Sequence, residues 1–174
     1  MNGKELIVVT GLPASGKSTL ANQIAIHKGL SRISSDDIRS FYLYNSNFEP
    51  NIKYSKYISA MVFDVIYLKA ELELTYKNGV VLDGIFFFPP GWERLKEIAD
   101  RTGSEVFFYQ FIGSFETLST RMKNRNNDPY NSEADIEVLK KHWDILEKND
   151  FQYPTRNPDF LKLNFHWEEI EVKN

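Results

Sequence analysis

The stretch that decides the fold is Gly11-Leu12-Pro13-Ala14-Ser15-Gly16-Lys17-Ser18-Thr19. It follows the apolar run Leu6–Thr10 and precedes the helix-compatible segment Leu20–Ala25. This is the pattern G-x-x-x-x-G-K-[ST] in the context that it requires, with a strand before it and a helix after it. Glycine lets successive backbone N–H groups turn toward an anion, and the N-terminus of the following helix adds partial positive charge. The stretch therefore predicts a loop that binds phosphate.

The residue types within the loop indicate which ligand it takes. Lys17 is expected to reach the β- and γ-phosphates of a nucleoside triphosphate, and the Ser18 hydroxyl is expected to ligate Mg²⁺. The expected donor is ATP. No Asn-Lys-x-Asp element that would read guanine occurs in the sequence, which disfavours a GTPase switch. The residues expected to bind it are Gly11, Pro13, Ala14, Ser15, Gly16, Lys17, Ser18 and Thr19.

Composition limits the class of protein. With 174 residues and 42% hydrophobic content, the chain fits a single folded domain over residues 1–174. It has no cysteine, which excludes disulfides, cysteine-based zinc sites and thiol chemistry. A net charge of −3 indicates no broad basic surface for duplex nucleic acid, although a nucleic-acid end could still be held locally.

The N-terminus and the hydropathy pattern bear on location. Met1–Glu5 leads directly into a strand, with no signal peptide before it, and no apolar run has the length of a membrane span. We therefore expect a soluble, cytoplasmic protein with no membrane partner.

Strand-like and helix-like segments alternate along the chain. Buried strands are expected at residues 6–10 and 80–83, a short strand or strand end at 31–35, a further strand at 105–112 and a candidate strand at 160–165. Helices are expected at 18–28, from 36, at about 53–76, and at 89–101, 115–124 and 132–148. This alternation predicts an α/β fold: a three-layer sandwich with a central parallel sheet of about five strands and helices on both faces. In the longest helix we expect one apolar stripe to pack in the core: Tyr54, Ile58, Met61, Val65, Leu68 and Leu72.

A second candidate element is Ser35-Asp36-Asp37-Ile38-Arg39, at the end of the second expected strand. Ligands of open α/β sheets lie outside the carboxyl ends of the strands, so these side chains should face the transferring phosphate. A carboxylate there can accept a proton from an attacking hydroxyl, and an arginine one turn further along can hold a substrate phosphate. An acidic helix start followed by a solvated arginine is the simpler alternative, and Asp37 competes with Asp36 as the base.

Asp83 ends the third expected strand, where a Walker-B aspartate assists Mg²⁺ directly or through water. Gly84 follows it, in place of the glutamate with which ATP-hydrolysing motors activate water. Transfer to a bound acceptor is therefore favoured over hydrolysis. A plain Asp-Gly turn at the strand end is the alternative.

Arg121 and Arg125 share one face of an expected helix, because they are four residues apart. Two guanidinium groups near the phosphates would neutralise charge that develops on the transferred group. We therefore expect an arginine-bearing lid at about residues 114–135, followed by a C-terminal strand segment at about 150–174. A solvated basic helix end is the alternative.

Together, the phosphate loop, Ser35–Arg39, Val81-Leu82-Asp83 and the two lid arginines resemble the kinase module of the polynucleotide 5′-hydroxyl kinases. These belong to a larger P-loop kinase group that includes zeta-type toxins and seryl-tRNA kinases, and the resemblance covers about residues 5–148. It implies a P-loop kinase-like fold, with Asp36 as general base on a 5′-hydroxyl and Arg39 on the acceptor's phosphate. It also implies that Lys17 and Ser18 handle the donor phosphates and Mg²⁺, that Asp83 organises the metal or the acceptor side, and that Arg121 and Arg125 act as lid arginines.

The expected function is thus ATP-dependent transfer of the γ-phosphate to a hydroxyl, with a polynucleotide 5′-OH as the acceptor. A small-molecule kinase of the same architecture, acting on a nucleotide sugar or a nucleoside-type acceptor, is the first alternative. A nucleotide-binding switch without transfer activity is the second. RNA against DNA, the oligomeric state and the choice between Asp36 and Asp37 stay open at this point.

Overall fold

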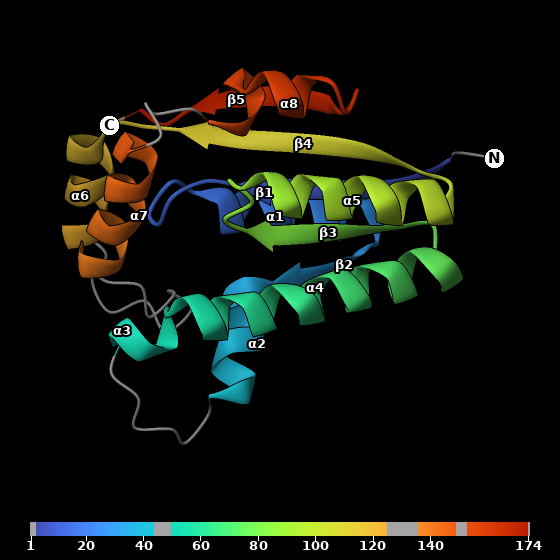
Figure 1. Ribbon diagram of the computed structural model, residues 1–174, viewed down its shortest axis with the longest axis horizontal. Coiled ribbons are helices and arrows are strands. Elements are labelled where there is room, and N and C mark those ends of the chain that lie inside the picture. The colour runs from blue at the N-terminus through green and yellow to red at the C-terminus, as the bar shows by residue number, and fades with distance from the viewer. Residues whose placement is uncertain (1–2, 44–49, 125–135, 149–152, 174) are drawn as a thin grey trace.

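A computed structural model describes residues 3–43, 50–124, 136–148 and 153–173. Its centre is one five-stranded parallel sheet in the order β2-β3-β1-β4-β5 (Figure 1). The strands are β1 (Lys4–Thr10), β2 (Ser31–Ser34), β3 (Gly79–Gly84), β4 (Ser104–Ile112) and β5 (His166–Glu171). The predicted parallel sheet of about five strands is confirmed.

Alternate residues of the central strands pack on opposite faces of the sheet, because successive side chains of a strand point to opposite sides. Leu6 and Val8 of β1 belong to the core that α4 (Lys56–Tyr76), α5 (Pro89–Thr102) and α8 (Pro158–Leu161) cover. Ile7 and Val9 pack instead against α1 (Lys17–Lys28) on the other face. Two helical layers therefore enclose the sheet, as the alternation of elements predicts.

A third apolar cluster lies beyond the carboxyl ends of the strands, where α6 (Phe115–Lys123) and α7 (Ile136–Lys148) stand (Figure 1). Its buried members are Leu12, Phe87, Leu118, Leu139, Leu146, Tyr153 and Val172. The cluster holds α7 over the end of the sheet that carries the phosphate loop. The short elements α2 (Ser35–Tyr42), α3 (Pro50–Lys53) and the 3-10 turn η1 (Pro154–Arg156) complete this end.

The prediction of a strand at residues 160–165 is wrong, because the last strand is β5, His166–Glu171. Pro158 begins the short helix α8 and Asn157 caps it, its Oδ1 accepting a hydrogen bond from Asp159 N at 2.9 Å. Phe160 is fully buried against the rings of Trp92 and Phe108. Phe160, one of the apolar residues that suggest a strand, therefore packs beneath α5 and does not extend the sheet.

The apolar stripe expected in the core of the longest helix is wrong in part. Tyr54 is buried and Ile58 and Val65 are partly buried, but Met61, Leu68 and Leu72 are exposed. The sheet instead meets the neighbouring face of α4, whose buried residues are Val62, Ile66, Tyr67, Ala70 and Leu74. Both faces of α4 are apolar, so periodicity alone does not say which of them packs inward. Among the described residues, no helix combines the length and the apolar character needed to cross a membrane.

Candidate active site

The phosphate loop joins β1 to α1 with the backbone conformation that a nest of N–H groups requires. Gly16 has a φ of 97° and Ala14 a φ of 66°, both in the left-handed region. Gly16 is also the N-cap of α1, so the loop ends where the positive end of that helix begins. At Gly11 a Cβ would stand 2.7 Å from both Phe111 Cβ and Ser15 Oγ, which restricts that position to glycine.

Lys17 is the first residue of α1 and is buried, whereas Ser18 is half-buried and Thr19 is exposed. Pro13 and Lys17 line a cavity at the carboxyl end of the sheet. The structure therefore places the loop lysine where the sequence expects it, next to a space that a ligand can enter.

Helix α2 begins directly after β2 because Ser34 caps it, its Oγ accepting a hydrogen bond from Asp37 N at 3.3 Å. Asp36 lines the cavity, and Asp37 does not. Asp37 is 69% exposed at its side chain and its Oδ2 accepts a hydrogen bond from Arg32 Nη1 at 3.2 Å. Of the two carboxylates, only Asp36 shares a cavity with Lys17.

Arg39 is held inside the chain. Its Nη1 lies 3.1 Å from Asp36 Oδ1 and 3.4 Å from the Ser35 carbonyl oxygen, and its Nε donates to the Lys53 carbonyl at 3.1 Å. The guanidinium also lies over the Tyr54 ring, 4.4 Å from its centroid. These contacts leave Arg39 only 7% exposed. The structure thus brings Arg39 to Asp36, as the sequence predicts, and turns much of its hydrogen-bonding capacity to the protein itself.

Asp83 lies at the end of β3, paired in register with Val9 of β1 and Ser34 of β2, and is 2% exposed. Its Oδ2 accepts hydrogen bonds from Arg32 Nη2 at 2.6 Å and from Arg32 Nε at 3.2 Å. Its Oδ1 is buried with no hydrogen-bond partner among the described residues. A buried carboxylate oxygen of this kind requires a partner, and a bound metal ion or a metal-bound water would supply one.

These residues fit Mg²⁺. Within the described ranges, no group of three or more His, Asp or Glu side chains could hold a metal ion. Mg²⁺ at phosphoryl-transfer sites characteristically takes only one or two protein ligands and completes its shell with water and substrate phosphates. Ser18 and Asp83 are the residues that would hold it here, and when bound it would withdraw charge from the phosphate oxygens.

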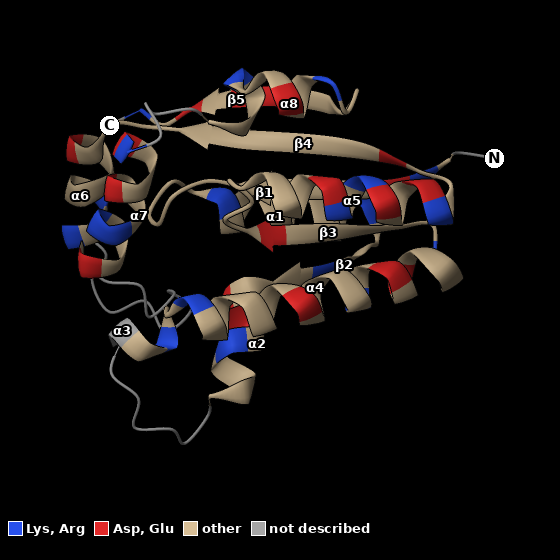
Figure 2. Ribbon diagram, in the orientation of Figure 1, with Lys and Arg blue, Asp and Glu red and all other residues tan. Residues whose placement is uncertain are grey.

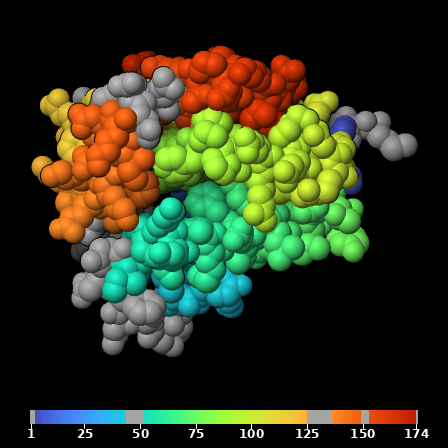
Figure 3. All heavy atoms as spheres, in the orientation of Figure 1, coloured from blue at the N-terminus to red at the C-terminus, as the bar shows by residue number. Residues whose placement is uncertain are grey.

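The cavity that joins these groups has a volume of about 710 Å³. It lies between α4, α7 and the segment that runs from β3 into α5, and it opens on the face seen in Figure 3. Aromatic and apolar side chains form most of its wall: Tyr54, Phe63, Tyr67, Ile85, Phe86, Phe88, Pro90, Val138 and Ile145. The space next to Lys17 and Asp36 is thus large enough for a small organic molecule and mostly apolar.

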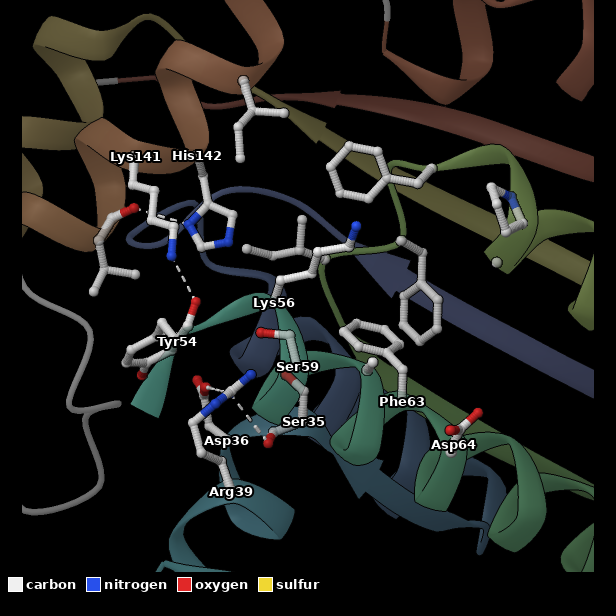
Figure 4. A pocket seen from close by; sticks show the side chains of 18 of the residues that line it. Ser35, Asp36, Arg39, Tyr54, Lys56, Ser59, Phe63, Asp64, Lys141 and His142 are labelled. Atoms are coloured by element: carbon white, nitrogen blue, oxygen red, sulfur yellow. Dashed lines mark hydrogen bonds and ion pairs between the residues drawn. The ribbon is translucent and has the colours of Figure 1, made fainter. Parts of the chain in front are cut away.

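Helix α7 forms one wall of the cavity through Val138, Lys141, His142 and Ile145, which share a face of the helix. Lys141 Nζ donates a hydrogen bond to the Tyr54 carbonyl at 2.7 Å and so ties α7 to the start of α4 (Figure 4). His142 Nδ1 lies 2.8 Å from the Val138 carbonyl oxygen. Burial, and then the neighbouring Lys141, Lys17 and Arg39 charges, lower the pKa of His142, so its ring is neutral at pH 7.

The expected lid is only partly described. Arg121 lies on α6, where its Nη2 donates a hydrogen bond to the Lys173 carbonyl near the C-terminus, and it does not line the cavity. Arg125 lies outside the described residues. The structure therefore does not bring Arg121 to Asp36 and Lys17, and its role as a lid arginine stays a prediction.

Five residues of this region are not predicted from the sequence: Arg32, Lys56, Arg94, Lys141 and His142. Arg32 lies on β2, next to β3 in the sheet, and a basic residue in the strand beside a strand-end carboxylate is the signal that could have indicated this pair. The others reach the cavity from helices whose crossing no local pattern predicts.

A family model described as an AAA domain, AAA_33, matches residues 6–148. The chain belongs to this AAA domain family. The matched residues include the phosphate loop, Asp36, Asp83 and the α7 wall of the cavity. The candidate site described above therefore lies within the matched range.

Solved structures share the fold of the AAA domain. A candidate kinase from Chloroflexus aurantiacus superposes with a TM-score of 0.71 at 20% identity, over 98% of this chain and 86% of that one. A gluconokinase from Sinorhizobium meliloti gives 0.65 at 16% identity, over 99% and 83%. A shikimate kinase from Bacteroides thetaiotaomicron gives 0.53 at 15%, over 97% and 86%. The chain therefore has the fold of P-loop kinases, which confirms that part of the resemblance. None of the three is described as a polynucleotide kinase, and that subgroup stays a prediction.

Proposed function

We propose that this protein is an ATP-dependent kinase that transfers the γ-phosphoryl group to the hydroxyl of a small molecule bound in the cavity. One observation carries the proposal: Lys17 of the phosphate loop and the carboxylate of Asp36 line the same cavity. The donor phosphates would lie on the loop, and an acceptor in the cavity would present its hydroxyl between them and Asp36.

In the transfer, Asp36 accepts the proton of the acceptor hydroxyl, and the oxygen of that hydroxyl forms a bond to the γ-phosphorus. The bond between that phosphorus and the β–γ bridging oxygen breaks, and its electron pair leaves with ADP. Lys17 and the backbone N–H groups of the loop stabilise the charge on the transferring group. The apolar wall keeps water away from it, which favours the acceptor hydroxyl over hydrolysis.

A polynucleotide 5′-hydroxyl is the more specific acceptor that the sequence motifs suggest. Its support is the pairing of Asp36 and Arg39 on one helix face, as in the kinases that the chain resembles. The small-molecule acceptor has further support in the wall that α7 and Tyr54 build around the cavity, and in the small-molecule activities named for the gluconokinase and shikimate kinase neighbours.

Labelled ATP offered with a panel of acceptors tests the proposal. The panel contains small hydroxyl compounds, nucleotide sugars and oligonucleotides with free 5′-hydroxyls. Asp36→Asn should lower transfer by about 10²–10⁴ with little change in ATP affinity, because the amide cannot accept the proton. The matched variant Asp37→Asn should transfer at nearly the unaltered rate.

Lys17→Ala tests the donor side of the same proposal. It should lower transfer by about a hundredfold or more, since it removes a charge that stabilises the transition state. ATP binding with no acceptor-dependent turnover across the panel would instead favour the non-catalytic switch. Full activity of Asp36→Asn would remove Asp36 from the base position.

A further inference from the structure

The cavity carries a surplus of positive charge that the fold does not explain. Among the described residues, five basic side chains line it and two carboxylates: Lys17, Arg39, Lys56, Arg94, Lys141, Asp36 and Asp64. The chain as a whole has a net charge of −3, so the surplus is local. Elsewhere acidic and basic residues are interspersed, as along α5 in Figure 2.

Both carboxylates of the cavity are already neutralised by arginine. Asp36 Oδ1 lies 3.1 Å from Arg39 Nη1, and Asp64 Oδ1 lies 3.0 Å from Arg94 Nη1. Three lysines remain. Lys17 belongs to the donor phosphates, which leaves Lys56 and Lys141 for whatever occupies the acceptor side. Lys141 uses one of its three ammonium protons on the Tyr54 carbonyl.

Of these lysines, Lys56 is the one whose position the contacts within the protein explain least. Within the described part of the chain, its side chain makes no hydrogen bond or ion pair, and Figure 4 shows it at the cavity beside Ser59 and Tyr54. It is the first residue of the 21-residue helix α4, whose first turn holds no acidic residue. A cation at that end opposes the helix dipole, so the lysine costs the helix stability. Lys56 is exposed to solvent at the cavity, where its charge is available to an anionic ligand.

Three phenylalanine side chains in the remaining wall of the cavity favour a particular body for that ligand. Phe63, Phe86 and Phe88 present ring surface, and they offer no hydrogen bonds to the hydroxyls of a polyol. Flat apolar groups pack favourably on such rings.

We infer that the acceptor is a small organic anion with an aromatic or similarly flat apolar body, and that Lys56 binds its anionic group, a carboxylate or a phosphate. That this molecule is phosphorylated rests on the proposed function, whereas its binding in the cavity does not. The hydroxyl of such a molecule would point toward Asp36 and Lys17, and its anionic group toward the start of α4.

The test measures binding by isothermal titration calorimetry with a non-hydrolysable ATP analogue present. The probes are para-hydroxymethylbenzoate, para-hydroxymethylphenyl phosphate, the neutral benzyl alcohol, and gluconate as an anion without an apolar body. The two aromatic anions should bind about tenfold or more tightly than either of the others. The stronger of the two shows whether the anionic group is a carboxylate or a phosphate.

The variant Lys56→Glu separates this role from a structural one. It places an acid at the N-terminus of α4, so its thermal stability should be equal or higher. Its affinity for the aromatic anions should still fall by about tenfold or more, with affinity for benzyl alcohol and the ATP analogue within about twofold. Lys69→Ala, which removes an exposed lysine of the same helix outside the cavity, is the matched control and should change none of these values.

Three results would overturn the inference: benzyl alcohol binding as tightly as the anions, gluconate binding as tightly as para-hydroxymethylbenzoate, or unchanged anion affinity in Lys56→Glu. Failure of the proposed function looks different. The aromatic anions would then bind in the Lys56-dependent manner, and labelled ATP would phosphorylate none of the hydroxyl probes or panel acceptors.

Discussion

Arg39 Nη1 lies 3.1 Å from Asp36 Oδ1, one turn further along the same helix, and is held there by contacts that do not involve any ligand. The Lys53 carbonyl and the Tyr54 ring fix the guanidinium from the start of the next helical region. Because one carboxylate oxygen is engaged by Arg39, the other oxygen is the one left for a substrate proton. For the proposed base Asp36, this geometry favours Arg39 as a positioning residue.

Replacing Arg39 by lysine keeps the charge but loses the planar fork that contacts Asp36, Ser35 and Lys53 together. If Arg39 positions the base, kcat should fall about tenfold or more while KM for ATP changes less than about twofold. Steady-state kinetics with each substrate varied in turn measures this. A loss confined to KM of phosphorylated acceptors would instead make Arg39 the acceptor anchor that the sequence resemblance implies.

Asp83 and Arg32 form a second ion pair at the candidate site. Removing the guanidinium in Arg32→Leu leaves a nearly fully buried carboxylate without its partner. Leaving a buried charge uncompensated is costly, and we expect a loss of about 3 kcal/mol in the free energy of unfolding. Urea denaturation measures it. The double variant Arg32→Leu/Asp83→Asn should recover most of the loss, because the uncompensated charge is gone. No recovery would show that Arg32 stabilises by packing alone.

The sequence predicts those parts of the site that follow from local pattern. The phosphate loop, the start of α2 at Ser35 and the strand that ends at Asp83 each depend on neighbours within a few residues, and each lies where it is expected. Arg39 shows where this kind of reasoning stops. Its place one turn beyond Asp36 is a local fact, but its orientation depends on Lys53 and Tyr54, which are brought to it by the packing of α4.

The wall formed by α7 could not be predicted for the same reason. Lys141 contacts the Tyr54 carbonyl across 87 residues of sequence, and nothing near either residue indicates that they meet. The prediction of the last strand is wrong for a different reason. Apolar residues at 160–165 have strand-like composition, but the Asn157-Pro158 helix start takes precedence, and the aromatic rings fill a gap beneath α5.

The two apolar faces of α4 give a direct stability test. Leu74 is fully buried against the sheet, whereas Leu68, on the neighbouring face of the helix, is 60% exposed. Leu74→Ala should lower the free energy of unfolding by about 2–5 kcal/mol, and Leu68→Ala by less than about 1 kcal/mol. Urea denaturation of the pair distinguishes the faces. Equal losses would mean that the exposed face is covered by another surface, as in an oligomer.

His142 makes stability depend on pH in a direction that follows from its burial. Burial lowers its pKa from 6.5, and the nearby cations Lys141, Lys17 and Arg39 lower it further, while its contact with the Val138 carbonyl opposes the shift. The unfolded chain therefore binds a proton at a pH where the folded chain does not.

The stability that neutral His142 provides is complete above pH 6.5 and is lost as the pH falls through its lower value in the folded state. His142→Gln is neutral at every pH and should flatten this part of the pH dependence, whose slope for one proton cannot exceed about 1.4 kcal/mol per pH unit. Urea denaturation at a series of pH values below neutrality measures the slope. His27→Gln, which changes an exposed histidine on α1, is the matched control and should keep the slope of the unaltered protein. If the His142 and His27 variants behave alike, the ring of His142 is already charged or solvated in the folded protein. The conclusion that His142 is a neutral side chain of the cavity would then be wrong.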